Sequence, residues 1–363
     1  MWPLPDRKIA TREFERLLLR VPNWLGDQVM ATAAIAAVRA RYAATRITGL
    51  GAESARLLYA GAGWFDDFLV AKNRDNPLHL AGRLRPLRFD ACLLLAGSFR
   101  SALPPFLARI PHRIGYRRSG RTPLLTAHWA RPRPEGKRAP YPTKRFYLDL
   151  VEKLGARGGG RVRLGFDEGS REMCEGWMRK RHIRPEEPIL AMCVGAAFGP
   201  SKLWPAAYFA QVADEMVRRH GARVVLLCGP GEERIGAEVR TLAHSSLVDT
   251  GLAPLPLDLL KAVIARSRVL LTNDTGPRHI ATAFHVPVVC LMGPTDPTYT
   301  DSDMSGQVVL RADGVACSPC HLKVCPIDHR CMVWIRPEEA LAAVESAWNS
   351  PPADRIALLQ ESP

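Results

Sequence analysis

Short apolar runs alternate with amphipathic stretches along the whole chain. In the N-terminal half, the apolar runs predict strands at 17–21, 46–50, 67–71, 90–95 and 114–116, and the amphipathic stretches predict helices at 28–42, 54–60 and 147–154. Strands that alternate with helices are typical of a parallel, doubly wound sheet. The fold class expected from this pattern is therefore α/β.

The same alternation starts again in the C-terminal half. There the pattern predicts strands at 189–194, 223–228, 269–271 and 286–292, and helices at 206–220, 256–267, from 277 onward and at 337–348. A glycine-rich break at 155–160 and an expected linker at 163–188 separate the two series, and 363 residues exceed one typical domain. We predict an N-terminal domain at 1–165 and a C-terminal domain at 166–363, and we allow the last helix to pack back on the N-terminal domain.

Three polar loops follow strands of the C-terminal half, at 195–204, 229–233 and 273–279. Parallel sheets bind ligands at the carboxyl ends of their strands, so these loops are expected to meet at one edge. Lys202 can neutralise a phosphate there, and Glu232 can accept hydrogen bonds from ribose hydroxyls. The three loops together predict a site for a nucleotide diphosphate.

The third of these loops carries the most specific pattern. A strand breaks at Asp274, and a helix starts near Pro277, where proline fits because its missing N–H would be unpaired. The amides around Gly276 then form an anion site at the helix start, to which Thr275 and His279 can add side-chain donors. For Asp274 alone, a helix cap is an equally good interpretation.

Asp27 directly follows the first predicted strand, at the first turn of the next helix. Two interpretations fit this position: an N-cap, or a carboxylate at the mouth of a cleft that takes a proton from a substrate hydroxyl. Gly26 lets the backbone approach a ligand closely. The sequence contains no Gly-x-Gly-x-x-Gly or Walker pattern, so neither a dinucleotide cofactor nor a P-loop is predicted.

The formal charge of +14 predicts an anionic partner, which could be nucleic acid, a phosphorylated substrate or an acidic membrane surface. The segment 101–148 is strongly basic and contains one acidic residue, Glu135. Its cations are Arg109, Arg113, Arg117, Arg118, Arg121, Arg131, Arg133, Lys137, Arg138, Lys144 and Arg145. We interpret this segment, much of it expected to be loop, as a docking face for an anionic acceptor, with Arg100, Arg117 and Arg118 as acceptor-binding residues. A solvated basic surface is the alternative.

Four cysteines gather near the C-terminus, at Cys317, Cys320, Cys325 and Cys331. The Cys-x-x-Cys spacing of the first pair suits a zinc knuckle, and His321 and His329 lie among the thiols. The second pair lacks this spacing, so packed thiols in a loop and a structural metal cluster both remain open. The other five cysteines, Cys92, Cys174, Cys193, Cys228 and Cys290, lie mostly in apolar runs and are expected to be core residues.

The start of the chain contains no apolar segment typical of a signal peptide, and no uninterrupted apolar stretch reaches the ~20 residues of a membrane span. Nine cysteines without a secretion signal indicate reduced thiols in the cytoplasm.

Five stretches in order resemble the lipopolysaccharide heptosyltransferases of glycosyltransferase family 9, most closely the heptosyltransferase II branch. They are residues 20–27 (RVPNWLGD), 113–117 (RIGYR), 195–205 (GAAFGPSKLWP), 273–279 (NDTGPRH) and 293–297 (GPTDP). The resemblance covers nearly the whole chain, from about residue 16 to 346. Cys193-Val194 stands where a proline is expected, and Phe198 where tyrosine is commoner.

The resemblance implies a GT-B glycosyltransferase fold, in which two Rossmann-like domains face an interdomain cleft. It implies inverting transfer of heptose from ADP-L-glycero-D-manno-heptose to the first heptose of the inner core, without a cofactor or catalytic metal. Asp27 matches the expected general base and Lys202 the lysine that holds the donor phosphate. Asp274, Thr275, Gly276 and His279 match the donor loop, and Glu232 matches the ribose contact less closely.

Two other functions remain open on the sequence. A related heptosyltransferase could add to Kdo or another core acceptor. A basic nucleic-acid-binding protein would explain the charge but not the polar strand-end loops, and the sequence carries no known RNA or DNA module. We therefore expect a phosphorylated lipid A-core acceptor, peripheral attachment to the cytoplasmic face of the inner membrane, and no nucleic acid.

Overall fold

The computed structural model describes residues 7–72, 75–132, 140–158, 160–300 and 306–350. The chain divides into two compact units, residues 1–165 with 298–302, and residues 166–297 with 303–363. Each unit contains one parallel six-stranded sheet with helices. The α/β fold class predicted from the alternating pattern is confirmed.

The strands of the N-terminal unit are parallel and follow the order β3-β2-β1-β4-β5-β6. They are β1 (Arg16–Arg20), β2 (Arg46–Gly51), β3 (Asp67–Val70), β4 (Ala91–Leu94), β5 (His112–Arg117) and β6 (Ala127–Ala130). The central strand β1 is apolar because it is covered on both faces, and its Leu18 pairs with Thr48 on one side and Cys92 on the other. The order in which strands are added to the sheet reverses between β1 and β4. In such sheets, ligands usually bind at this switch point.

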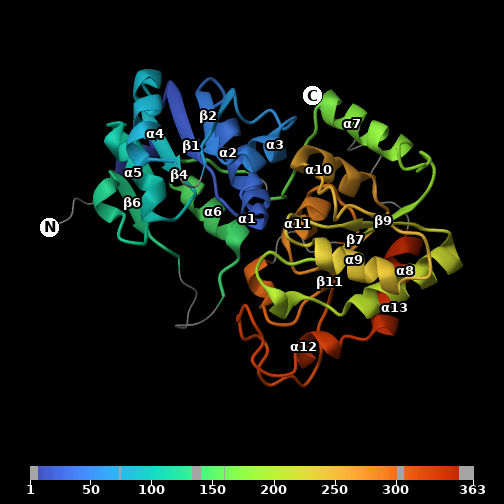
Figure 1. Ribbon diagram of the computed structural model, residues 1–363. Helices are drawn as coiled ribbons and strands as arrows, with labels where there is room; N and C mark the ends of the chain where they lie inside the picture. The colour runs from blue at the N-terminus through green and yellow to red at the C-terminus, as the bar shows by residue number, and fades with distance from the viewer. Residues whose placement is uncertain (1–6, 73–74, 133–139, 159, 301–305, 351–363) are drawn as a thin grey trace. The chain divides into compact units, whose positions relative to one another are not determined.

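Helices cover both faces of this sheet (Figure 1). They are α1 (Leu25–Met30), α2 (Thr32–Arg41), α3 (Glu53–Tyr59), α4 (Pro77–Leu84), α5 (Phe99–Leu107) and α6 (Thr143–Glu152). One group joins α1, α2, α3 and α6, and the other joins α4 and α5. Short 3₁₀ turns lie at η1 (Arg7–Thr11), η2 (Arg85–Leu87) and η3 (Thr122–Leu124).

The C-terminal unit repeats this arrangement with the order β12-β11-β10-β7-β8-β9. The strands are β7 (Ile189–Cys193), β8 (Arg223–Leu227), β9 (Val248–Asp249), β10 (Val269–Asn273), β11 (Val288–Leu291) and β12 (Gln307–Leu310). Counted within its own unit, this is the same strand order as in the N-terminal unit. The switch in direction lies between β7 and β10.

The helices of the C-terminal unit also form two layers. They are α7 (Glu168–Arg179), α8 (Ala206–His220), α9 (Glu233–Leu242), α10 (Leu257–Arg266), α11 (Gly276–Ala283), α12 (Arg330–Val333) and α13 (Pro337–Asn349), with 3₁₀ turns η4 (Pro200–Lys202) and η5 (Pro297–Thr300). Helix α8 packs between α9 and α13, while α10 packs against α7 and α11.

The last described helix, α13, packs against the core of its own unit. The apolar face of α13, with Leu341, Val344 and Trp348, joins the core formed by α8 and the sheet of its own unit. Arg268 fixes the end of this helix, since its Nε donates to the Trp348 carbonyl at 2.8 Å.

Two segments expected to be linker or loop contain regular elements. The predicted linker at 163–188 contains α7, whose buried Cys174, Trp177 and Met178 recur at helical spacing among charged residues. The basic segment 101–148 is largely regular, with α5, β5, β6 and α6, although its prolines and glycines are typical of loops. Arg133, Glu135, Lys137 and Arg138 lie outside the described residues.

The predicted helix at 28–42 is divided, because α1 ends at Met30 and α2 starts at Thr32. Among the described helices, none is both long and apolar enough to cross a bilayer.

Candidate active site

Three strands of the C-terminal unit end together at one edge of the sheet. Strand β10 pairs with β7, and β7 pairs with β8, all in parallel. These strands end at Cys193, Leu227 and Asn273, so the three predicted polar loops, which follow them, meet at the carboxyl edge.

Asp274 is the centre of a buried charge cluster at this edge. Its Oδ2 accepts from Lys202 Nζ at 2.5 Å and from Thr295 Oγ1 at 2.7 Å. Its Oδ1 accepts from Arg278 Nη1 at 3.0 Å. Lys202 also donates to the Asp274 carbonyl at 3.0 Å. The carboxylate therefore binds two cations, and it holds the lysine in one position.

Asp274 does not cap the following helix, because Thr275 occupies the N-cap position of α11. The capping interpretation of Asp274 is therefore wrong. Thr275, Gly276 and Pro277 are half-exposed at the start of α11. The amides of a first helical turn have no partner within the helix, so this end suits an anion.

The electrostatics of this cluster favour a charged aspartate and a neutral histidine. Burial alone would raise the pKa of Asp274, but the nearby Lys202 and Arg278 outweigh it and hold that pKa below its usual value. Burial, and then the charge of Arg278, lower the pKa of His279. His279 is buried on the inner side of α11, so at neutral pH it is an uncharged imidazole beside the cluster.

A second buried residue, Asn273, joins the two strands that flank this edge. Its side-chain amide donates to the carbonyl of Val194 at 2.8 Å and accepts from the Trp204 amide at 3.1 Å. The Trp204 indole in turn donates to the Ile335 carbonyl at 2.9 Å. Asn273 thereby fixes the loop that carries Lys202, a role that the sequence motif did not reveal.

Glu232 lies across the end of β7. Its Oε2 accepts from the Gly229 amide at 2.7 Å. A Cβ atom on Gly195 would lie 1.9 Å from the Glu232 carboxyl carbon, so only glycine fits beneath this side chain. Burial is the main cause that raises the pKa of Glu232.

The N-terminal unit carries Asp27 in the first turn of α1, after β1. Trp24 is the N-cap of this helix, so the capping interpretation of Asp27 is wrong. Burial raises the pKa of Asp27 to about 6, although the charge of Arg118 partly opposes the rise. A half-buried carboxyl group with this pKa can accept a proton near neutral pH.

Side chains near Asp27 hold it in place. Burial is the main cause that raises the pKa values of Tyr59 and Tyr147, and the negative charge of Asp27 raises them further. Both tyrosine side chains therefore lie close to Asp27. The Tyr59 hydroxyl donates to the backbone carbonyl of Gln28 at 3.0 Å, and the side-chain Nε2 of Gln28 donates to the backbone carbonyl of Asn23 at 3.1 Å. These bonds fix the turn on which Asp27 lies.

A cavity of about 230 Å³ opens near the switch between β1 and β4. It is lined by cations from three segments, Arg20, Lys72 and Arg100, together with Asp75. Arg20 donates to the carbonyls of Val21 and Leu50 and to the side chain of Asn23. Burial lowers the pKa of Arg20. The cavity suits an anionic group.

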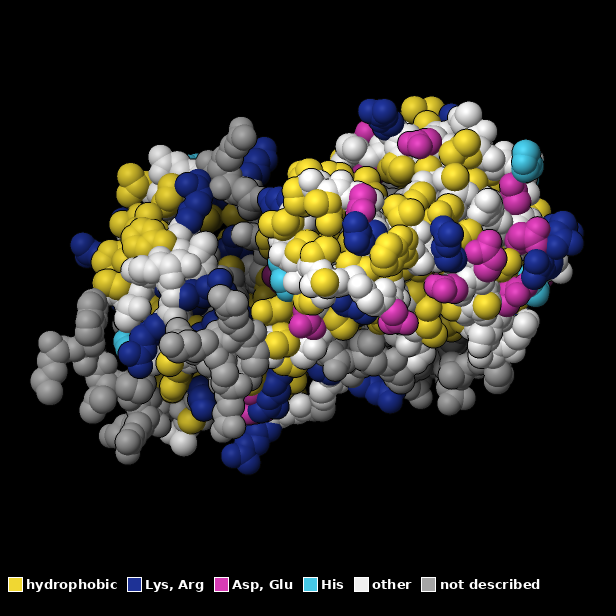
Figure 2. Space-filling view, turned by 90° about the horizontal axis from the view of Figure 1, so that it is seen from below, with side chains coloured by type: hydrophobic (Ala, Val, Ile, Leu, Met, Phe, Trp, Pro, Cys, Tyr) yellow, Lys and Arg dark blue, Asp and Glu magenta, His cyan; other side chains and the backbone are white. Residues whose placement is uncertain are grey.

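The structure separates the three predicted acceptor arginines. Arg118 lies near Asp27 and packs over Gly97, whereas Arg100 lines the cavity. Arg117 is exposed at the end of β5, and no contact in the described part of the chain joins it to either place. Basic side chains with few acidic ones are visible on the N-terminal unit in Figure 2.

Sequence reasoning assigned no role to Arg20, Lys72, Arg278 or Thr295, although all but Lys72 lie in the stretches that resemble family 9. Arg278 stands four positions after Asp274 on a helix, so the spacing alone could have indicated the pair. Thr295 lies in the matched stretch 293–297, but its spacing does not show that it reaches the Asp274 carboxylate from a distant loop.

A model of glycosyltransferase family 9 (heptosyltransferase) matches residues 78–330 of the chain. The chain belongs to glycosyltransferase family 9. The match spans both units and ends just before Cys331. The resemblance inferred from the five motifs is thereby confirmed.

Family 9 members with known names and structures are similar to this chain over most of their length. Lipopolysaccharide heptosyltransferase 2 of Salmonella typhimurium is 28% identical over 303 residues, which are 78% of this chain and 84% of that protein. The structure of Escherichia coli ADP-heptose lipopolysaccharide heptosyltransferase II has a TM-score of 0.76 and 25% identity, and the match covers 92% and 98% of the two chains. A family 9 glycosyltransferase from Veillonella parvula shares the fold, with a TM-score of 0.78, 21% identity and 93% and 97% coverage. The GT-B fold of family 9 heptosyltransferases is therefore confirmed for this chain.

Proposed function

We propose that this family 9 glycosyltransferase moves heptose from ADP-heptose to the first heptose of the lipopolysaccharide inner core. Membership of the heptosyltransferase family over residues 78–330 carries this assignment. The donor and acceptor classes are those printed in the names of the similar Salmonella and E. coli proteins. Transfer to Kdo is the runner-up within the same chemistry.

The C-terminal unit is the proposed donor site. Lys202, held by Asp274, and the amides at the start of α11 offer positive charge to the diphosphate. We assign Glu232, in the loop between β8 and α9, the hydrogen bonds from the ribose hydroxyls. Asp274 and His279 are buried, so we assign them a positioning role. They hold Lys202 and the start of α11 in place, in addition to any contact that they make with the sugar.

Asp27 is the proposed base. It takes the proton of an acceptor hydroxyl, whose oxygen attacks the anomeric carbon from the face opposite ADP. The bond to the diphosphate breaks, the configuration inverts, and ADP leaves with the electron pair. Positive charge from Lys202 and α11 stabilises the leaving diphosphate. The chemistry therefore uses protein groups of both units.

The N-terminal unit is the proposed acceptor side. Arg20, Lys72 and Arg100 line a cavity that suits a phosphate or carboxylate of the inner core. The excess of basic side chains on this unit favours an anionic, lipid-linked acceptor at the cytoplasmic face of the inner membrane. We propose peripheral contact with that surface.

A transfer assay with purified chain tests the function directly. ADP-heptose is offered with two truncated cores, one ending in the first heptose and one ending in Kdo. We expect the mass of one heptose to be added to the first core and little to the second. Addition only to the Kdo core would select the runner-up. Salt-sensitive DNA binding without ADP binding would instead favour the nucleic-acid class.

The pH dependence of transfer should report Asp27. Because its pKa is raised to about 6, the carboxylate form is lost as the pH falls through that value. We expect kcat/KM to fall with unit slope below about pH 6. Arg118→Ala removes the cation that opposes the rise, so this limb should move to higher pH. Arg117→Ala is the matched control and should leave the limb in place. A rate that stays level between roughly pH 5 and 7 would remove Asp27 as the titrating base.

Gly195 offers a test of Glu232. In Gly195→Ala the new methyl group displaces the Glu232 carboxylate, which also loses its bond to Gly229. We expect the Kd for ADP to rise about tenfold, the effect of one lost hydrogen bond of roughly 1–1.5 kcal/mol. In Gly82→Ala, where the methyl group meets open space on helix α4, ADP affinity should not change. Calorimetric titration with ADP makes the comparison, and unchanged affinity in Gly195→Ala would exclude the ribose contact.

A further inference from the structure

The four C-terminal cysteines differ from the other five in their surroundings. Cys92, Cys174, Cys193, Cys228 and Cys290 are all buried, as core thiols are. By contrast, Cys317 is exposed and Cys320 and Cys325 are half-buried, while Cys331 is buried. Packing in a core therefore does not account for this group.

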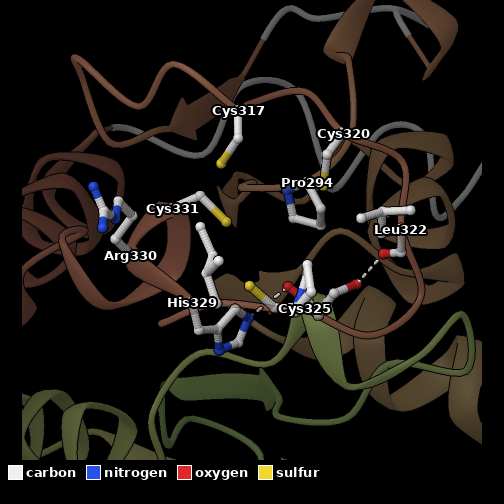
Figure 3. A pocket seen from close by; sticks show the side chains of 11 residues that line it. Pro294, Cys317, Cys320, Leu322, Cys325, His329, Arg330 and Cys331 are labelled. Atoms are coloured by element: carbon white, nitrogen blue, oxygen red, sulfur yellow. Dashed lines mark hydrogen bonds between the residues drawn. The ribbon is translucent and has the colours of Figure 1, made fainter.

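All four thiols line one small cavity. Its volume is about 60 Å³, and Pro294, Leu322 and His329 complete its wall. Figure 3 shows the sulfur atoms turned toward the space between the loop and Pro294. A cavity of this size has room for a single ion but not for a sugar or nucleotide.

The loop that carries the cysteines has no regular secondary structure and is held mainly by scattered hydrogen bonds, such as those of Ser318 to the Gly293 carbonyl and of the His321 amide to the Pro294 carbonyl. Residues 311–329 contain no helix or strand, and irregular loops of this length are uncommon in compact domains. Val315 is buried in the core, but three large apolar side chains of the loop face solvent, with Leu322 46%, Val324 65% and Ile327 60% exposed. Hydrophobic side chains gather on this lower face of the C-terminal unit (Figure 2). The loop buries too few of them to be ordered by hydrophobic contact alone.

We propose that Cys317, Cys320, Cys325 and Cys331 form a structural site for one thiophilic divalent cation of the zinc class. Four thiolates are a common tetrahedral ligand set for such ions, and the Cys317–Cys320 spacing matches that of zinc knuckles. Binding forms four metal–sulfur bonds, and each thiol releases its proton to solvent. Among the described residues, no three ligands stand ready to hold an ion as placed, so the thiols must turn about their Cα–Cβ bonds to close on it.

The position of this loop gives the metal a consequence for the donor site. The Ser201 amide donates to the Lys323 carbonyl at 3.0 Å, and its hydroxyl donates to the Leu322 carbonyl at 2.5 Å. His329 Nε2 lies 2.6 Å from the Ser201 carbonyl oxygen (Figure 3). Ser201 directly precedes Lys202, so a metal that orders the cysteine loop also fixes the turn that presents this lysine.

Metal analysis of the full chain tests the site. The protein is purified with reductant, incubated with Zn²⁺, desalted and measured by mass spectrometry of the elements. We expect about one Zn²⁺ per chain. The double variant Cys317→Ser/Cys320→Ser should retain none, whereas Cys174→Ala, which removes a thiol elsewhere in the same unit, should retain the full amount. Co²⁺ added to the unchanged chain should give the visible absorption of a tetrahedral thiolate complex, which does not depend on how the variant folds.

Two outcomes would overturn the proposal. One is a reduced, folded chain that takes up neither Zn²⁺ nor Co²⁺ while all four thiols react with a thiol reagent. The other is equal metal retention by the double variant and the unchanged chain. The effect on the donor site rests on the proposed function, and there we expect removal of Zn²⁺ to raise the Kd for ADP about fivefold, roughly 1 kcal/mol. Normal metal content without ADP binding would contradict the donor assignment and leave the metal site intact.

Discussion

Replacing Asp27 with asparagine is expected to lower kcat/KM for heptose transfer by about 10²–10⁴-fold, the usual contribution of a general base. The amide keeps the size of the side chain but cannot accept the acceptor proton. Because Asp27 lies in the N-terminal unit and the proposed nucleotide contacts lie in the C-terminal unit, the Kd for ADP should stay unchanged. Steady-state rates and calorimetric ADP titration on one preparation provide both measurements.

Asp67→Asn is the matched control for this variant. Asp67 is a carboxylate of the same unit, but it stands at the start of β3, at the amino edge of the sheet, and pairs with Arg46. Its replacement should leave transfer close to normal. Near-normal transfer by Asp27→Asn would show that another group takes the proton.

Asp274→Asn is expected to lower the free energy of unfolding of the C-terminal unit by about 3–5 kcal/mol, the usual effect of breaking a buried ion pair. The asparagine leaves Lys202 and the fully buried Arg278 without their anion. ADP binding should weaken as well, because Lys202 loses the partner that fixes its position. Urea unfolding followed by circular dichroism, together with ADP titration, measures both effects.

The stabilisation by Asp274 should also depend on pH. Its folded-state pKa lies below the ordinary value of 3.8, so the contribution is fully present above that value and is lost as the pH falls further.

Glu215→Gln is the control for Asp274→Asn, because Glu215 binds Arg218 and Arg219 on the surface of α8 at similar distances. Solvent screens the ion pairs of Glu215, so their loss should hardly change the free energy of unfolding. An equal, small effect of both substitutions would show that the Asp274 cluster does not hold the edge together.

The elements with the clearest apolar periodicity could be predicted from the sequence. The helix expected at 206–220 is α8 with the same bounds, and the strands at 17–21, 189–194 and 269–271 correspond to β1, β7 and β10 within two residues. These segments are long or continuously buried, so their pattern is strong. Short edge strands such as β9 and β12 lack that pattern and were missed.

The candidate site could be predicted in its residues but not in its bonds. The strand-end rule brought Lys202, Glu232 and Asp274 to one edge. This rule could not show that Lys202 and Asp274 bind each other. The two residues are 72 positions apart in the sequence, and their contact depends on how each side chain is oriented. Helix caps failed for a similar reason, since Trp24 and Thr275 occupy the cap positions expected for Asp27 and Asp274.

The buried cluster around Asp274 contains two cations, Lys202 and Arg278, and one anion, while the neighbouring His279 is uncharged at neutral pH. Within this cluster the two cations therefore outnumber the anion by one. A departing nucleotide diphosphate carries more negative charge than this surplus can balance. If the proposed donor site is correct, we expect this excess of one positive charge to favour the diphosphate while its bond to the sugar breaks, without binding ADP so tightly that it cannot leave.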